Sequence, residues 1–191
     1  MSNDYLFEEI KNVSLSMFRK NFFGIYHGSI SAKIDAGKFI INKKDALFDE
    51  IKQESLINIS MNLRDYKWNT ASLDTAIHEQ IYKDIPSAKY IAYTMPPYVV
   101  AYSLRHQTLD PSDYFGNMKI GKIKVYDPGN FNDWYDRAPY EIGKYFKDDS
   151  CQLMLVKGYG LIVYDRDIIQ MVKKVALIEN SARLIMLGEL C

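Results

Sequence analysis

The residues best suited to chemistry lie in the segment SLDTAIHEQIYKD, which begins at Ser72. Asp74 and His78 are four residues apart in it, so a helix here would place both side chains on one face. A carboxylate within hydrogen-bond reach of a substrate can act as a general acid or base, and an imidazole changes charge near neutral pH. Two other roles are open, because Asp is a preferred helix N-cap and a helix histidine can simply be hydrogen-bonded.

Tyrosine is the other residue type that invites a binding hypothesis, since the chain holds 15 of them. Aromatic pockets with a few polar groups are common small-molecule sites. The same residues are common at protein interfaces, because a phenol packs its ring and keeps its hydroxyl in water. Tyr93, Tyr114 and Tyr159 are therefore open to both roles.

The elements that must position these residues mix helices and strands without a regular βαβ alternation. Strands are predicted at residues 29–34, 38–42, 56–61, 90–95, 121–126, 153–156 and 161–164. Helices are predicted over about the first 20 residues, at 45–51, from Asp74 onward, and at 98–106, 139–146 and 167–187. This pattern favours an α+β protein or a layered antiparallel sheet.

Composition sets the class of protein. A chain of 191 residues with 48% hydrophobic residues predicts a single domain over residues 1–191 with a substantial core. Lys+Arg and Asp+Glu both number 24, which gives no reason to expect nucleic acid or a membrane surface as a partner. Two cysteines, Cys151 and Cys191, make no disulfide framework, and no signal peptide or membrane span is visible, so a soluble cytoplasmic protein is expected.

The sequence around Asp74 resembles the class II aldolase, ribulose-phosphate epimerase and adducin superfamily. Members of that superfamily carry Ser-Ser-Asp or Ser-Ser-Glu, a helical His four residues on, and then a strand with His-x-His. This chain has SLD, His78 and then YTM, which ends at Met95. Upstream, GSISAK from Gly28 is similar to the family's Gly-Asn-x-Ser-x-Arg.

The resemblance implies a three-layer α/β fold with a central, mostly antiparallel sheet between helices, assembled as a homotetramer. It implies catalytic roles for Asp74, His78 and Asp113, the last because DYFG is similar to the epimerase's Ala-Asp-Tyr-Phe-x-Gly, whose aspartate reaches the neighbouring subunit's site. A local turn beside Pro111 explains Asp113 equally well. Ligand contacts are implied for Ser29, Ser31, Ser72, Tyr93, Met95, Tyr114 and Tyr159.

The family binds zinc through His-x-His and an Asn-His-Gly turn, and the matching places here are Tyr93, Met95 and Tyr159. A phenol must lose a proton with a pKa of about 10 before it binds a divalent ion well. A thioether suits Cu(I) better than zinc. The sequence therefore predicts no metal and no other cofactor, with these side chains filling the vacated pocket.

These substitutions favour a family member that binds a small polar or sugar-like molecule, or that serves as an oligomeric interaction protein. The alternative is an active sugar-phosphate aldolase or epimerase with enediolate chemistry in a rebuilt site around Asp74, His78 and Asp113. In that case Lys157 is either an electrophile in a desolvated site or a turn lysine facing water. Lys43 and Lys44, in the loop that corresponds to a phosphate loop, either replace hydroxyls with charge or are solvated.

Overall fold

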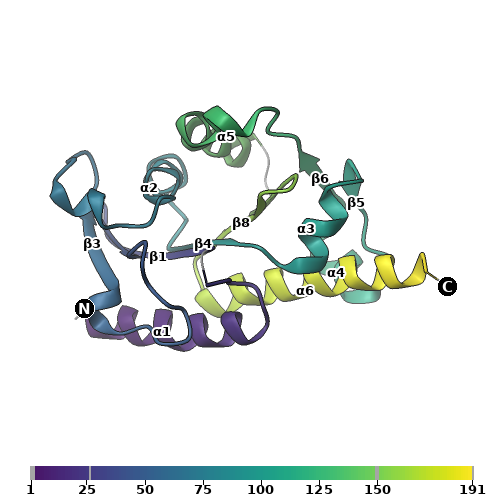
Figure 1. Ribbon diagram of the computed structural model, residues 1–191, viewed down its shortest axis with the longest axis horizontal. Helices are drawn as coiled ribbons and strands as arrows, with labels where there is room; N and C mark the ends of the chain where they lie inside the picture. Colours follow the sequence, from purple (N-terminus) through teal and green to yellow (C-terminus); the bar gives the residue numbers. More distant parts are fainter. Residues whose placement is uncertain (1–2, 26, 149–150, 191) are drawn as a thin grey trace.

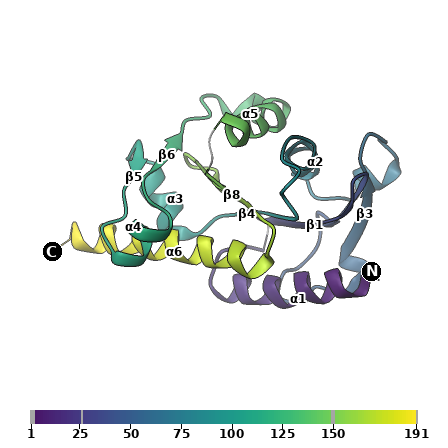
Figure 2. The same ribbon diagram turned by 180° about the vertical axis from the view of Figure 1, so that it is seen from behind.

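One sheet runs through the middle of the protein and has helices on both faces (Figures 1 and 2). In this computed structural model the described residues, 3–25, 27–148 and 151–190, form eight strands in the order β3-β2-β1-β4-β8-β7-β6-β5. Neighbouring strands in these ranges are antiparallel except β6 and β7, which are parallel. The predicted layered, mostly antiparallel architecture is confirmed.

The elements follow the chain as helices and strands in irregular succession. The strands are β1 (Ser29–Asp35), β2 (Lys38–Asn42), β3 (Leu56–Ser60), β4 (Tyr90–Thr94), β5 (Thr108–Leu109), β6 (Ile123–Tyr126), β7 (Leu153–Val156) and β8 (Gly160–Asp165). The helices are α1 (Asn3–Arg19), α2 (Thr75–Asp84), α3 (Pro97–Ser103), α4 (Tyr114–Lys119), α5 (Trp134–Asp148) and α6 (Ile168–Gly188). Short 3-10 turns lie at η1 (Gln53–Ser55), η2 (Tyr66–Asn69) and η3 (Phe131–Asp133).

Alternation along the strands divides the core into two layers. Ile30 and Ala92 point to the face covered by α1, α3 and α6, whereas Ile41, Ile91 and Ile162 point to the face covered by α2 and α5. In Figure 1, α2 and α5 lie on one side of the sheet and α1 and α6 on the other. Because successive strand residues face opposite ways, Ser29 and Ser31 lie on the α2 side, opposite to Ile30.

The structure differs from the sequence-based expectations in three places. Residues 45–51 form turns and not a helix, because Phe48 is drawn into the core, where its ring stacks on Phe23 at 4.2 Å between centroids. The helix expected to begin at Pro139 begins at Trp134 and carries Pro139 inside it. Helix α4 and strand β5 lie in a stretch that gave no periodic signal.

No helix among the described residues is both long enough and apolar enough to cross a membrane. The longest, α6, has 21 residues, and its buried side chains lie against the sheet with polar residues between them.

Candidate functional site

A small polar cavity, the Asp74 pocket, opens where the segment before β1, the loop after β2 and the loop before α2 meet α5. Its volume is about 100 Å³. Its lining residues include Asp74, Ser72, Lys44, His27, Tyr93 and Tyr135. The pocket thus places one buried carboxylate, a lysine and aromatic side chains around a single space.

Asp74 is the most buried charged group of this pocket, with 4% of its surface exposed. The Tyr159 hydroxyl donates to its Oδ1 at 3.0 Å, and the Ser72 hydroxyl donates to its Oδ2 at 3.4 Å. Burial raises the pKa of the Asp74 carboxyl, and hydrogen bonds from Ser29, Tyr159 and Ser72 partly offset that rise. A carboxyl in this state can exchange a proton at a higher pH than an exposed aspartate.

Of the roles left open for Asp74, capping of the helix through its side chain is not what the structure shows. Asp74 occupies the N-cap position of α2, but its carboxylate accepts no bond from the helix amides. The carboxylate is turned instead toward the hydroxyls of Tyr159 and Ser72. An N-cap carboxylate can interact with other groups only when it is not bonded to the helix amides, and this is the case for Asp74.

His78 lies beneath the pocket and is fully buried. Ser31 Oγ lies 2.6 Å from its Nδ1 and Ser29 Oγ lies 2.9 Å from its Nε2. Burial lowers the pKa of His78 to about 3, so its ring is neutral near pH 7. The prediction of a hydrogen-bonded helix histidine is confirmed, and both ring nitrogens are engaged within the protein.

These bonds join into one buried chain of polar groups. The Ser31 hydroxyl lies 2.8 Å from the Tyr82 hydroxyl, and the Ser29 hydroxyl bonds to Asp74 as well as to His78. A neutral imidazole has one donor nitrogen and one acceptor nitrogen. One of the two serine hydroxyls therefore donates to the ring, and the other accepts a hydrogen bond from it. Ser29 and Ser31 therefore orient the carboxylate and the imidazole.

The fold brings together Tyr93, Met95 and Tyr159, the positions that match the zinc ligands of the resembling family. The Tyr93 and Tyr159 rings stack at 4.5 Å between centroids and 18° between planes, and the Tyr93 hydroxyl donates to the Tyr159 carbonyl at 2.7 Å. Met95 packs against the same cluster. Gly160 lets β8 approach β4 closely, since a Cβ at residue 160 would lie 2.4 Å from the Thr94 carbonyl oxygen.

Phenols and a thioether are poor ligands for zinc. Burial and the nearby Asp74 charge raise the pKa of both the Tyr93 and the Tyr159 phenols. Each hydroxyl already acts as a donor within the protein, and phenolate formation is the step that a divalent ion would need. Among the described residues, no group of three or more His, Cys, Asp or Glu side chains is arranged to hold a metal ion.

The remaining predicted site residues lie elsewhere. Asp113 is the N-cap of α4: it accepts from the Gly116 amide at 2.9 Å and from the Ser181 hydroxyl, and the Ser181 bond is the main cause of its lowered pKa. Its neighbour Tyr114 is 72% exposed. Lys157 pairs with Asp127 on the surface at 2.9 Å, which matches the turn-lysine alternative. None of these residues lines the Asp74 pocket as the structure describes it.

Sequence reasoning missed three polar residues that line the pocket. Tyr135 of α5 lies with its ring edge-on to Tyr159 at 6.3 Å, and burial raises the pKa of its phenol. His27 precedes β1, and Asn42 is the last residue of β2. Asn42 accepts from the Ile30 amide at 2.8 Å and so ties the hairpin strands together. Lys44, for which two roles were open, lines the pocket, and no local pattern singles out Tyr135 among the tyrosines.

Comparison with known proteins gives a clear family match. The sequence model described as "Class II Aldolase and Adducin N-terminal domain" matches residues 8–186. No curated protein matches the chain significantly. The match spans nearly the whole chain, including every residue of the Asp74 pocket.

Solved structures of the same architecture agree with this match. L-fuculose-1-phosphate aldolase from Thermus thermophilus superposes with a TM-score of 0.86 at 18% identity, over 97% of this chain and 94% of that one. YgbL from Klebsiella pneumoniae gives 0.82 at 18% identity, over 97% and 90%. A sugar-phosphate aldolase from Thermotoga maritima gives 0.71 at 13% identity, over 95% of each chain. At these identities the likeness shows the fold.

Proposed function

The chain belongs to the class II aldolase and adducin N-terminal domain family, and from this premise we propose that it binds a small polar molecule in the Asp74 pocket without using zinc. The observation that carries the proposal is the bond from Tyr159 to Asp74, at 3.0 Å. Tyr159 lies at a position where the family resemblance leads one to expect a metal ligand, and its phenol is protonated.

The chemistry of the pocket favours a ligand with hydroxyl or amine groups. Asp74 can accept a hydrogen bond from such a group when it is ionised and donate one when it is protonated. Lys44 at the mouth supplies a positive charge, and Tyr135 supplies a ring and a hydroxyl. The volume of about 100 Å³ is well below the roughly 300–1,000 Å³ of drug-sized sites. A small polyol or a short sugar matches both the polarity and the size.

A thermal-shift screen of polyols, aldoses and ketoses tests the proposal on the purified full chain. At least one compound should raise the melting temperature of the wild type, because a ligand that binds only the folded state stabilises it by mass action. Asp74→Asn should abolish that rise, while Asp113→Asn, with its carboxylate at the cap of α4, should retain it. A screen with no stabilising compound, or a rise that survives in Asp74→Asn, would overturn the proposal.

The second candidate is an active lyase or epimerase of the aldolase type. The raised pKa of Asp74 favours it, because a carboxyl that changes protonation closer to neutral pH is a better acid or base. It would have to stabilise an enediolate without the metal, which contributes several kcal/mol in such reactions. Exchange of solvent protons into dihydroxyacetone phosphate or a ketopentose phosphate, lost in Asp74→Asn, would establish it. If no compound of a broad panel of aldoses and ketoses shows exchange, this second candidate function is excluded.

We also propose that the chain assembles as a cytoplasmic homotetramer and uses that assembly for interaction. Support comes from the exposed apolar side chains of α4, where Tyr114, Phe115 and Met118 are all more than 60% exposed. Contiguous exposed apolar groups are typical of interaction surfaces. Sedimentation of the wild type and of a Phe115→Ser, Met118→Ser variant tests this, with a monomeric wild type as the contradicting result.

A further inference from the structure

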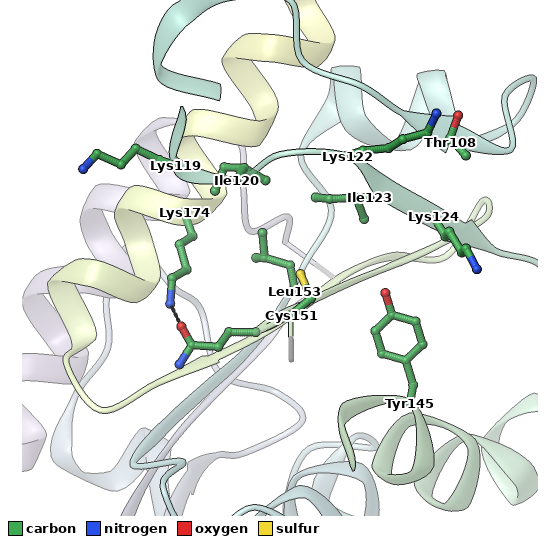
Figure 3. Close-up of a pocket in the computed structure, with 11 residues that line it drawn as sticks. Thr108, Lys119, Ile120, Lys122, Ile123, Lys124, Tyr145, Cys151, Leu153 and Lys174 are labelled. Carbon is green, nitrogen blue, oxygen red and sulfur yellow. Dashed lines mark hydrogen bonds between the residues drawn. The ribbon is translucent and has the colours of Figure 1, made fainter. Parts of the chain in front are cut away.

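A second and larger cavity, the lysine cavity, lies far along the fold from the Asp74 pocket and shares no lining residue with it. Its volume is about 570 Å³. It lies where the segment between α4 and β6 faces the start of β7, between α5 and α6 (Figure 3). Its apolar part is formed by Ile120, Ile123 and Leu153, the last two of them buried in the core.

Lysine side chains border this cavity on two sides. Figure 3 shows Lys119 and Lys174 on one side and Lys122 and Lys124 on the other. In the part of the chain that the structure describes, no Asp or Glu lines the cavity. The whole protein has equal numbers of acidic and basic residues, so this local excess reflects how the fold sorts its charges.

Acidic residues just outside the cavity neutralise only part of this charge. Lys174 is held by Asp165 and by the Gln152 side chain. Lys122 pairs with Asp110 at 3.6 Å, and both side chains are 60% exposed, so solvent screens that pair strongly. Lys119 and Lys124 form no ion pair with any described residue.

Polar and aromatic groups complete the cavity. Thr108 offers a hydroxyl, and the Tyr145 hydroxyl points from α5 toward the cavity (Figure 3). The Tyr145 ring is held in place by edge contacts with Tyr126 at 6.4 Å and Phe146 at 5.7 Å between centroids. A concave space of this size with an apolar floor, a fixed ring and a cationic rim suits a small amphiphilic anion.

We propose that the lysine cavity binds a small organic phosphate, with the phosphate among the lysine ammonium groups and a planar apolar body against Ile123, Leu153 and the Tyr145 ring. Lys119 and Lys124 supply charge that no described ion pair engages, and a lysine ammonium binds phosphate as a point charge that side-chain rotation can bring inward. The site is separate from the small polar ligand of the Asp74 pocket and stands or falls independently of it.

Calorimetric titration of the full chain with phenyl phosphate and with AMP, at low ionic strength, tests this site. Both phosphates should bind, and phenol and adenosine should bind at least about tenfold more weakly. Added salt should lower the affinity for the phosphates, because the attraction is largely Coulombic. A Lys119→Glu, Lys124→Glu double variant should bind phenyl phosphate at least about tenfold more weakly. Lys173→Glu is the matched control: it lies on α6 beside Lys174 but is exposed outside the cavity, and its affinity should stay within about twofold of the wild type.

Alkylation of Cys151, which lines the cavity, supplies a second readout that does not depend on any lysine variant. Bound phenyl phosphate should slow the reaction of the Cys151 thiol with iodoacetamide, mapped by peptide mass so that Cys191 is scored apart, and phenol should not. The proposal would be overturned if neither phosphate gave a heat of binding and neither slowed the alkylation of Cys151. Binding that the double variant retains would also overturn it, as would binding that Asp74→Asn abolishes, since the latter would assign the phosphate to the Asp74 pocket.

Discussion

The Tyr159 hydroxyl donates a hydrogen bond to Asp74 Oδ1 at 3.0 Å, across 85 residues of the chain. The contact ties the turn before β8 to the start of α2 and turns the carboxylate away from the helix amides. It also brings a second phenol close, since Tyr93 stacks on Tyr159. A buried carboxylate is thus held by neutral hydroxyl donors, and this arrangement determines how the protein should respond to pH.

Replacing Asp74 with Asn should stabilise the protein at neutral pH. Burial raises the folded-state pKa of Asp74 above its unfolded value. Its favourable contribution is therefore complete below the unfolded pKa of about 4 and is lost as pH rises through the folded pKa. The free energy of unfolding of Asp74→Asn minus that of the wild type should grow from about pH 4 upward, by about 1.4 kcal/mol per unit of pKa shift. Urea denaturation at a series of pH values measures it.

The matched control for this variant is Asp136→Asn, an exposed aspartate on α5. Because this side chain is exposed, the substitution should change the free energy of unfolding by less than about 0.5 kcal/mol. An Asp74→Asn difference that does not change with pH would show that the carboxylate is not strained by burial.

His78 should make the protein lose stability as the solution becomes acidic. Burial lowers its folded-state pKa to about 3, so its contribution is complete above the unfolded pKa of about 6.5 and is lost as pH falls toward 3. His78→Gln should flatten this part of the pH dependence and cost about 1–3 kcal/mol at neutral pH through lost bonds to Ser29 and Ser31. The imidazole ¹⁵N shifts of His78 should report a neutral ring at pH 5. A charged His78 ring at that pH would refute the buried hydrogen-bond chain.

Gly160 should tolerate no side chain. Its φ is +146°, and a Cβ there would lie 2.4 Å from the Thr94 carbonyl oxygen and 2.7 Å from the Tyr93 ring. Gly160→Ala should therefore cost about 2 kcal/mol or more of unfolding free energy and reduce ligand binding by moving Tyr93. Gly188→Ala is the control, because nothing lies within 4 Å of its Cβ position in α6, and it should change stability by less than about 1 kcal/mol. Equal effects of the two changes would show that Gly160 is not needed for this close approach.

Asp113 should act on stability and leave the Asp74 pocket unchanged. Asp113→Ala removes the acceptor of the Gly116 amide and should cost about 0.5–2 kcal/mol. Chemical denaturation measures the cost, and ligand-induced thermal shifts of the same variant should match the wild type. A stable variant that has lost ligand binding or turnover would instead assign Asp113 to a site completed by a neighbouring subunit.

Local patterns predicted most of the strands because short apolar runs rich in β-branched and aromatic residues are bounded by turn residues. The Asp35-Ala36-Gly37 turn and the two prolines after β4 are strong local signals, and the structure has a hairpin and a strand end there. The helix predicted at residues 45–51 is absent because burial of Phe48 in the core, a tertiary effect that leaves no local trace, outweighs the local helix preference. Helix α4 is held by Asp113, Gly116 and Ser181, and Ser181 is distant in sequence.

The candidate site could be predicted only in part for the same reason. Asp74 and His78 were found because they share a short segment, and Tyr93 and Tyr159 because they match positions of a family pattern. The direction of the Asp74 carboxylate depends on Tyr159, which lies 85 residues away, so the local sequence suggested a cap instead. Tyr135 and His27 reach the pocket through the packing of α5 and of the segment before β1, which no local spacing encodes.

The central claim is that the Asp74 pocket works without zinc, and elemental analysis by plasma mass spectrometry tests it most directly. Untagged protein should be purified without chelator or added metal and its metal content compared with its chain concentration. We expect much less than one equivalent of zinc or any other divalent transition metal, because the Tyr93 and Tyr159 phenols have raised pKa values and are already hydrogen-bonded. About one zinc per chain, lost in Tyr159→Ala, would contradict the account and return zinc-dependent aldolase or epimerase chemistry to the site.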